Sequence, residues 1–338
     1  MKLQHEAELA ASPEEVWKAL VDPEQVRQYY YDMAVDSDWR PGATIVFSWA
    51  PGQEGESGVV VAAEPRRRLV LETKLLFGEE LRSEPPHRTS WELEPRGSRT
   101  RVRLLYDVPE EARLTGRLLQ DGGDAPLQGL RILVDAEARA ELERLPEIGE
   151  VEVCDLTPES LDDYLRFFDE VAFRDHPAWN SCYCSETHVD ASEDEHALRT
   201  GAESRELMAG LIGAGQVTAL LAFADGRAVA WCNYGETTRL AGLVRKLGLE
   251  AADHAGVGSV ACFVIGSRYR RHGIAERLLE AACERLAERG CSAVEAYPRR
   301  EPASDADAYR GRLRMYLKAG FEPYREAGRT LVVRKALP

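Results

Sequence analysis

The apolar positions of the chain recur with two different periods, and each period predicts one kind of element. Near the amino terminus, Leu3, Ala7 and Leu9 alternate with polar neighbours, which is typical of a half-buried strand. The next residues, Ser12-Pro13-Glu14-Glu15, combine a helix N-cap, a first-turn proline and a capping-box glutamate. They predict the start of a helix, and a second short helix is expected from Pro23 to Tyr29.

Strand-like runs separated by turn residues follow these two helices. They are Thr44–Trp49, Gly58–Ala63, Arg68–Thr73, Thr89–Glu94 and Arg101–Tyr106. After Asp124 the period becomes helical again, with a leucine stripe that runs to Leu145. One strand, two helices, a series of antiparallel strands and a terminal helix together predict a curved sheet wrapped around a helix.

The helical pattern breaks at Pro146-Glu147-Ile148-Gly149-Glu150, which predicts a domain boundary. We expect one domain in residues 1–148 and a second in residues 149–338. The second begins with a strand at Val151–Leu156 and a capped helix that runs through Phe168.

A hairpin is predicted in the middle of the second domain. After a helix around Ser204–Gly213, two apolar runs at Val217–Phe223 and Arg227–Tyr234 flank Asp225-Gly226. An Asp-Gly pair between two strand-like runs is a strong hairpin signal.

The stretch from Val260 to Gly290 combines an apolar strand, a basic turn and a long amphipathic helix. The strand ends at Ile265, and the helical period begins at Ile274. Gly273 lets the backbone approach a ligand closely, and the free N–H groups of the first helical turn attract an anion. In a chain of net charge -15, a local group of three arginines favours a polyphosphate over a carboxylate: Arg268, Arg270 and Arg271.

Length and composition narrow the class of protein. The 338 residues suit two globular domains, and the acidic balance argues against nucleic acid or an anionic membrane as a partner. No run approaches about 18 consecutive apolar residues, and the amino terminus has no signal-peptide segment, so a cytoplasmic location is expected. The seven cysteines lack the spacing of a disulfide framework, which favours reduced, structural thiols.

Four motifs in the first half carry a family resemblance. They are Ser12–Leu20, the Trp39-x-Pro41-Gly42 turn, Gly58-Val59-Val60 and Pro65–Leu69. They resemble the START-like (SRPBCC) superfamily, in the branch related to the activator of heat-shock-protein ATPase. The resemblance implies a helix-grip fold, in which a curved antiparallel sheet and a long C-terminal helix enclose a pocket for an apolar ligand. The residues themselves assign no chemistry to this half, because its aromatic side chains are interpreted more readily as core than as a ligand box.

Two motifs in the second half carry another resemblance. They are Arg270-x-x-Gly273-x-Ala275, placed between a strand and a helix, and Tyr316-x-x-x-Gly320-Phe321. They resemble the pyrophosphate loop and the tyrosine–glycine–phenylalanine segment of the GNAT superfamily of N-acetyltransferases. The resemblance implies a mixed α/β sheet, acetyl-CoA (coenzyme A) as the cofactor, and transfer of its acetyl group to an amine.

The same resemblance implies roles for individual residues. The cofactor's arm is expected to pair with backbone groups of Phe263, Val264 and Ile265. The pyrophosphate is expected to be held by Arg270, which adds charge, and by the backbone N–H groups of Arg271, His272, Gly273, Ile274 and Ala275. Tyr316 is expected to be the general acid, since a phenol can give a proton to a departing thiolate.

The attacking amine also needs a proton acceptor. Glu295 is the first candidate for this general base, because it interrupts an otherwise apolar strand. Glu236, after the hairpin, is an alternative base. Cys262 is an alternative of another kind, a covalent acyl carrier, although a thiol in an apolar strand is more often inert packing.

The segment from Asp175 to His188 has an unusual composition. Cys182, Cys184 and two histidines, His176 and His188, are zinc-ligand types, but only one residue separates the cysteines, unlike a standard zinc knuckle. A loop over the acceptor site, with Trp179 and Tyr183 as walls, is therefore favoured, and no metal site is predicted.

These inferences combine into an α+β fold of two domains and one leading function. The chain is expected to be an acetyl-CoA-dependent N-acetyltransferase acting on the amine of a small molecule or a peptide, with an appended domain that binds an apolar ligand. The alternative is a non-catalytic ligand sensor or co-chaperone-like binding protein with a CoA-binding scaffold. The sequence leaves the acceptor and the oligomeric state open.

Overall fold

The computed structural model describes residues 1–144, 148–249, 254–300, 302, 307–327 and 330–338. The chain divides into two compact units, and each has a seven-stranded sheet in its described residues. The first unit comprises Met1–Arg144, Asp175–Ser181 and Ser192–Ala202; the second comprises Leu145–Arg174, Cys182–Ala191 and Glu203–Pro338. The α+β fold expected from the sequence is confirmed. Pro146 and Glu147, at the predicted boundary, lie outside the described residues.

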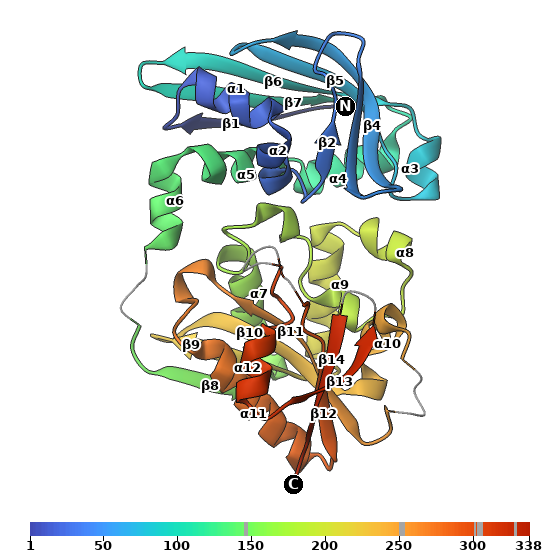
Figure 1. The fold of residues 1–338 in the computed structure, drawn as a ribbon, viewed down its shortest axis with the longest axis vertical. Helices are drawn as coiled ribbons and strands as arrows, with labels where there is room; N and C mark the ends of the chain where they lie inside the picture. Colours follow the sequence, from blue (N-terminus) through green and yellow to red (C-terminus); the bar gives the residue numbers. More distant parts are fainter. Residues whose placement is uncertain (145–147, 250–253, 301, 303–306, 328–329) are drawn as a thin grey trace. The chain divides into compact units, whose positions relative to one another are not determined.

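The first sheet is antiparallel, in the strand order β1-β7-β6-β5-β4-β3-β2 (Figure 1). Its strands are β1 (Lys2–Leu9), β2 (Ala34–Asp36), β3 (Thr44–Ala50), β4 (Gln53–Glu64), β5 (Arg68–Leu75), β6 (His87–Arg96) and β7 (Arg99–Asp107). The helices of this half are α1 (Pro13–Val21), α2 (Pro23–Tyr29), α3 (Glu79–Ser83), α4 (Arg113–Gly122), α5 (Ala125–Val134) and α6 (Ala136–Glu143).

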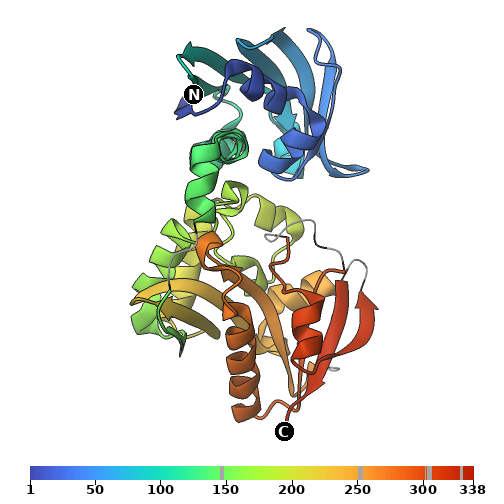
Figure 2. The ribbon, with the colours of Figure 1, turned by 60° about the vertical axis from the view of Figure 1, so that its left-hand side comes forward.

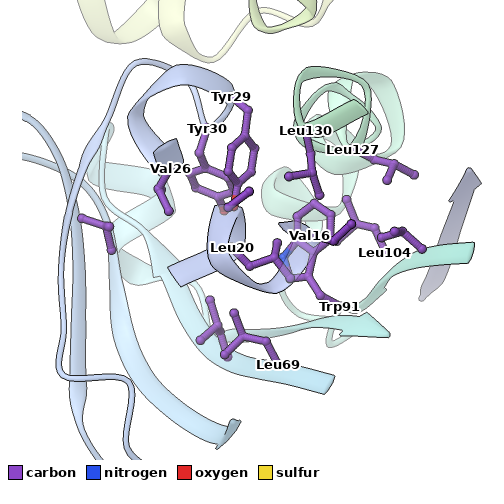
Figure 3. Close-up of a cluster of buried hydrophobic side chains, with 14 of the residues drawn as sticks. Val16, Leu20, Val26, Tyr29, Tyr30, Leu69, Trp91, Leu104, Leu127 and Leu130 are labelled. Atoms are coloured by element: carbon purple, nitrogen blue, oxygen red, sulfur yellow. The ribbon is translucent and has the colours of Figure 1, made fainter. Parts of the chain in front are cut away.

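The buried face of this sheet packs against α1, α2 and α5. Alternate residues of its strands are buried, as the period of a strand requires. Figure 3 shows the resulting core, which contains Val16, Leu20, Tyr29, Leu69, Trp91, Leu104, Leu127 and Leu130.

The terminal helix differs from the single helix that the leucine stripe predicted. The structure has α5 and α6, separated at Asp135, and a further helix, α4, before them. Asp135 has an extended backbone, and its side chain accepts hydrogen bonds from the N–H groups of Glu137 and Ala138. One helix therefore ends and the next begins at this aspartate, because its carboxylate satisfies the first N–H groups of α6.

The second sheet is mixed, in the strand order β13-β14-β12-β11-β10-β9-β8, and only β11 and β12 pair in parallel among its described strands. Its strands are β8 (Val151–Asp155), β9 (Ala219–Ala224), β10 (Arg227–Glu236), β11 (Val257–Ile265), β12 (Ala293–Ala296), β13 (Glu322–Ala327) and β14 (Thr330–Ala336). The helices in this half of the chain are α7 (Leu161–Glu170), α8 (Glu193–Ala197), α9 (Gly201–Gly213), α10 (Ala241–Leu247), α11 (Ile274–Glu288) and α12 (Leu313–Lys318).

Helices α7 and α11 cover opposite faces of this sheet. Trp231 of β10 packs against the rings of Tyr164 and Phe168 in α7, with ring centroids 5.0 and 5.7 Å away. The next residue, Cys232, belongs to the core that α11 forms with the other face. Figure 2 shows α11, in orange, running beside the strands. None of the described helices has both the length and the apolar character needed to span a membrane.

Candidate functional site

Strand β12 ends before its neighbour β11 does. Their parallel pairing covers Val257–Val260 and Ala293–Ala296, whereas β11 continues to Ile265 with β10 on its other edge. In the stretch beyond Val260, the N–H group of Phe263 donates to the carbonyl oxygen of Tyr309 at 2.6 Å. The segment Tyr309–Gly311, which precedes α12, therefore supplies the hydrogen-bond partner that β12 does not.

The turn after β11 presents consecutive N–H groups at the start of α11. The backbone of Arg271 has φ +65° and that of Gly273 has φ +72°. The first amide bonded into the helix is that of Arg277, which donates to the carbonyl of Gly273 at 3.2 Å. Among the described residues, the N–H groups of His272–Ala275 have no hydrogen-bond acceptor, and no atom lies within 4 Å of where a Cβ at position 273 would stand. These groups, at the positive end of a helix dipole, fit a pyrophosphate.

Two of the predicted phosphate ligands also hold the turn in shape. The Nε atom of Arg270 donates to the carbonyl of Ile265 at 3.1 Å. The Nδ1 atom of His272 donates to the carbonyl of Arg270 at 2.9 Å. The side chain of Arg270 thus folds back toward the end of β11, so its contribution to an anion site includes positioning the backbone.

A basic cavity of about 430 Å³ adjoins the same turn. It lies between α7, the start of β10 and the Gly266–Tyr269 segment. Its lining includes two acidic residues, Asp163 and Glu170, and four arginines: Arg166, Arg174, Arg227 and Arg268. This excess of cationic side chains, in a chain of net charge -15, favours an anionic ligand near the turn.

Tyr316 of α12 is fully buried, and its hydroxyl donates to the carbonyl oxygen of Arg310 at 2.7 Å. Burial raises the pKa of this phenol well above 10, so it stays protonated in neutral solution. Its ring packs against Phe321, the last residue of the predicted motif. Gly311 has φ +80°, and a Cβ there would stand 2.7 Å from the Tyr316 ring, so the segment before α12 is closely packed on it. Tyr309–Gly311 therefore joins Tyr316 to the open edge of β11.

Arg310, in this segment, was not predicted as a site residue. It is 6% exposed, and its buried Nε has no hydrogen-bond partner among the described residues. Its guanidinium lies 5.5 Å from the centre of the Tyr309 ring. A guanidinium keeps its charge when buried, so this arrangement favours an anion beside it. No sequence pattern distinguishes Arg310, because it is one of several arginines in the same polar stretch.

Glu295 is 1% exposed, and its polar contacts are to β14 and to residues just before β11 and just after β12. Its carboxylate lies 3.5 Å from Nε2 of His254 and 3.8 Å from Nε of Arg334, and it accepts from the Tyr297 hydroxyl at 3.5 Å. No hydrogen bond or ion pair in the described part of the chain joins it to Tyr316.

The alternatives to Glu295 have different surroundings. Glu236 lies 3.5 Å from Nε of Arg239 and is half-exposed. The sulfur of Cys262 is buried and lies 3.5 Å from the sulfur of Cys184.

The segment from Asp175 to His188, which contains the cysteines and histidines, is divided between the two units. His176 and Trp179 belong to the first unit, where the Nε2 and Nε1 atoms of their rings each lie 3.2 Å from a carboxylate oxygen of Asp32. Tyr183 belongs to the second unit, where its hydroxyl donates to Asp169 at 2.6 Å. Trp179 and Tyr183, the predicted walls of the acceptor site, are thus in different units. No group of metal-ligand side chains that could hold an ion is found among the described residues.

Two family models match different parts of the chain. Residues 10–132 match the family model for activator of Hsp90 ATPase homolog 1-like protein. Residues 177–321 match the family model for the acetyltransferase (GNAT) family. No curated protein matches the chain.

The chain is also similar to several solved structures. The crystal structure of CalU16 from Micromonospora echinospora has 20% sequence identity and a TM-score of 0.32, over 41% of this chain and 78% of that chain. Protein MLL2253 from Mesorhizobium loti has 19% identity and a TM-score of 0.35, over 39% and 96%. The Aha1 dimer from Colwellia psychrerythraea has 17% identity and a TM-score of 0.34, over 40% and 97%.

Proposed function

Because the chain joins a domain of the activator of Hsp90 ATPase homolog 1-like family to a domain of the GNAT acetyltransferase family, we propose that it is an acetyl-CoA-dependent N-acetyltransferase. The acceptor is the amine of a small molecule or a peptide. Residues 149–338 form the catalytic domain in this proposal. Residues 1–148 form a ligand-binding domain, for which an apolar ligand was expected.

The observation that carries the proposal is the run of amides at the start of α11. The N–H groups of His272–Ala275 have no acceptor in the described residues, and Arg270 and His272 fix the turn that presents them. These amides are proposed to hold the cofactor's pyrophosphate. When bound, acetyl-CoA would supply an acetyl group activated as a thioester, and coenzyme A would leave as the thiol.

The edge of β11 beyond Val260 is proposed to receive the cofactor's arm, at Phe263, Val264 and Ile265. Since the Phe263 amide donates to Tyr309, pairing of the arm with this amide requires the Tyr309 carbonyl to give way. One hydrogen bond then replaces another, so the exchange changes the free energy little.

Tyr316 is proposed to hold the proton that the leaving thiolate takes. Its raised pKa keeps the phenol protonated, and its hydrogen bond to the Arg310 carbonyl links α12 to the segment that borders β11. Glu295 remains the proposed general base, and Glu236 and Cys262 remain alternatives. The ion-pair contacts of Glu295 with His254 and Arg334 also give it a structural role, so its test must measure stability together with turnover.

Calorimetry with acetyl-CoA tests the cofactor site. Gly273→Asp places a carboxylate among the amides at the start of α11 and should abolish binding. Gly290→Asp is the matched control, because Gly290 follows α11 with φ +83° and also has no atom within 4 Å of a Cβ position. Both variants carry similar backbone strain, about 1–2 kcal/mol. The proposal fails if the wild type does not bind, or if Gly273→Asp binds as the wild type does.

A specific observation favours the non-catalytic alternative. The Phe263 amide and the Tyr316 hydroxyl both have hydrogen-bond partners within the segment Tyr309–Gly311. This is expected of a domain that does not convert a substrate. Release of free thiol from acetyl-CoA, measured with a panel of amines, separates the two functions. Only an enzyme shows turnover that depends on both the amine and Tyr316.

A further inference from the structure

Three of the seven cysteines meet beside β11 in the second unit. The sulfur of Cys262, in β11, lies 3.5 Å from the sulfur of Cys184, so the two atoms are in contact. The Cys184 thiol is also hydrogen-bonded to the sulfur of Cys182. Cys184 therefore has a sulfur neighbour on each side, which is the arrangement that thiol–disulfide exchange needs.

Hydrogen bonds hold Cys184 against the sheet. The Thr187 hydroxyl donates to the carbonyl oxygen of Cys184 at 3.0 Å. The side-chain amide of Asn233, in β10, donates to the same Thr187 hydroxyl at 2.6 Å. Asn233 stands directly opposite Cys262 in the pairing of β10 with β11. The strands that carry Cys262 thus also fix the segment that carries Cys184.

The backbone of this segment is strained. Tyr183 has φ +42° and Cys184 has φ +51°, in the left-handed region that favours glycine. A side-chain-bearing residue stays in this region only where its surroundings hold it, and such residues are concentrated at functional sites. The position of the Cys184 sulfur is therefore maintained at a cost in stability, which points to a function for the sulfur contacts.

The thiols differ in access and in acidity. Cys182 is half-buried, whereas Cys184 and Cys262 are buried. The hydrogen bond from the Cys184 side chain lowers the pKa of Cys182, although burial opposes this shift. The contacts with Cys182 and Cys262, together with burial, raise the pKa of Cys184. Cys182 is thus the accessible thiol of the group, and its reactive thiolate form is stabilised.

We propose that Cys182, Cys184 and Cys262 form a site of reversible oxidation, at which a peroxide reacts with Cys182 and the product is a buried disulfide between Cys184 and Cys262. The sulfur atoms of a disulfide are about 2.05 Å apart, so this pair needs only a small approach from its present contact. The inference is independent of acyl transfer, since no step uses acetyl-CoA.

Hydrogen peroxide is the oxidant in this proposal. The thiolate of Cys182 attacks one of its oxygens, so an S–O bond forms, the O–O bond breaks, and hydroxide leaves and takes up a proton to become water. The sulfur of Cys184 then attacks this sulfenic acid. An S–S bond forms, and the hydroxyl group leaves as water with the Cys184 proton.

An exchange step completes the sequence. Cys262 attacks the sulfur of Cys184, so the disulfide moves to the buried pair, and Cys182 leaves as a thiol with the Cys262 proton. The lowered pKa of Cys182 makes it a good leaving group. In total, two thiols and one peroxide give one disulfide and two waters.

Disulfide mapping of the full-length chain tests the product. The reduced protein is treated with hydrogen peroxide, denatured in an alkylating agent, digested and analysed by mass spectrometry without reduction. We expect a peptide pair that is joined through Cys184 and Cys262, that carries alkylated Cys182 and that dithiothreitol separates. Full alkylation of Cys184 and Cys262 after the treatment, or a disulfide that joins another pair in their place, would overturn the proposal.

Cys182→Ser tests the point at which the oxidant reacts. It should slow the loss of the Cys262 thiol about tenfold or more, because the peroxide then has to reach a buried sulfur. The matched control is Cys154→Ser, since Cys154 is also half-buried but its pKa is raised by burial and by Glu152. The control should leave the rate unchanged. Equal rates for Cys182→Ser and the wild type would contradict the proposed sequence of steps.

Cys262→Ala tests the exchange step. Without the third thiol, the reaction should stop at a disulfide between Cys182 and Cys184, which mass spectrometry detects within a single peptide. If Cys182 in this variant is instead found as a sulfinic acid or as an unmodified thiol, Cys184 does not attack it and the proposal fails.

Thermal unfolding gives a measurement that does not depend on any substitution. Peroxide treatment should raise the melting temperature of the second unit by about 5–10 °C, because a link between residues far apart in the sequence restricts the unfolded chain. Dithiothreitol should reverse this rise. Thiols that serve only as packing predict no rise with peroxide, and that result would count against the site.

Discussion

Buried polar side chains lie in both units, at the scale of single residues. Tyr316 and Arg310 lie beside the open edge of β11, and Glu56 and His87 lie inside the first sheet. Tyr316 was predicted from the sequence because it stands in a motif. The other three residues were not predicted, since hydropathy patterns place polar side chains at the surface. Burial of a particular arginine or glutamate depends on which strands become neighbours, which no local pattern encodes.

The phenol of Tyr316 can be tested by removing its hydroxyl. Tyr316→Phe should lower kcat by about 10²-fold or more, because the leaving thiolate loses its proton donor, while acetyl-CoA affinity stays unchanged. The variant should also lose about 1–3 kcal/mol of unfolding free energy, since the Arg310 carbonyl loses its partner. Thiol-release kinetics, calorimetry and thermal unfolding measure these three quantities.

Tyr234→Phe provides the comparison for this variant. Tyr234 is fully buried in the same unit, and its hydroxyl donates to Asp155 at 3.3 Å. It should change stability without changing kcat. Similar kcat values for Tyr316→Phe and the wild type would remove the proton-donor role.

His188 makes the stability of the second unit depend on pH. Burial lowers the pKa of His188 to about 4, from an ordinary value of 6.5, and its Nε2 accepts from the Asn233 amide at 3.0 Å. The unfolded chain therefore binds a proton that the folded chain does not as the pH falls from 6.5 toward 4. Stability contributed by the neutral ring is present above pH 6.5 and is progressively lost below it.

Urea denaturation at several pH values measures this effect. Between pH 7 and pH 4, the wild type should lose about 3 kcal/mol more unfolding free energy than His188→Gln, in which no imidazole titrates. Parallel pH profiles for the two proteins would contradict the assignment.

At the scale of elements, side-chain caps decide where the helices of the first unit begin. Ser12 caps α1 through a reciprocal contact with Glu15 at the surface. Asp135 caps α6 and also accepts from the Ala10 amide at the end of β1. Burial by itself would raise the pKa of the Asp135 carboxyl, but its three backbone N–H partners outweigh burial and lower that pKa.

Replacing the two caps should have unequal effects on unfolding free energy. Ser12→Ala should cost about 1 kcal/mol, which is typical of an exposed cap. Asp135→Ala should cost about 2–3 kcal/mol, because three N–H groups lose a partner in a buried position. Denaturant unfolding measures both, and equal losses would contradict the difference. The Asp135 effect should shrink in acid, as the pH falls through its lowered pKa.

Elements with strong local signals were predicted well. The helix Pro23–Tyr29 has the predicted bounds, and the predicted Asp-Gly hairpin joins β9 to β10. Strand β11 begins at Val257, earlier than expected, since Gly258 and Ser259 do not have strand propensity. Helix α4 was missed because polar and glycine residues interrupt its apolar positions, and the break at Asp135 required knowledge of the Ala10 contact.

At the scale of the whole molecule, the chain order does not coincide with the division into units. The first unit includes Asp175–Ser181 and Ser192–Ala202. In the sequence, both segments come after α7, which belongs to the second unit. The sequence predicted one boundary near residue 148, because composition and periodicity change there. It gave no sign of these segments, since their assignment depends on tertiary contacts alone.

Hydrogen exchange in the intact chain can locate the proposed cofactor site. Acetyl-CoA should increase protection in residues 257–288, which contain β11, the basic turn and α11. At about 100 times its dissociation constant, acetyl-CoA should stabilise the second unit by about 2.7 kcal/mol. Protection elsewhere in the chain without protection of these residues would contradict the site assignment.

The hydrogen bond from Phe263 to Tyr309 has one more consequence, for solubility. A strand that extends beyond its neighbour leaves unpaired amides and carbonyls. These groups can pair with a strand from another molecule, which is a common start of aggregation. In β11 the residues beyond Val260 are almost all apolar, so this strand edge, if exposed, would favour association with another molecule. The carbonyl of Tyr309 shields it within the same chain, and variants that loosen this segment should precipitate more readily than the wild type.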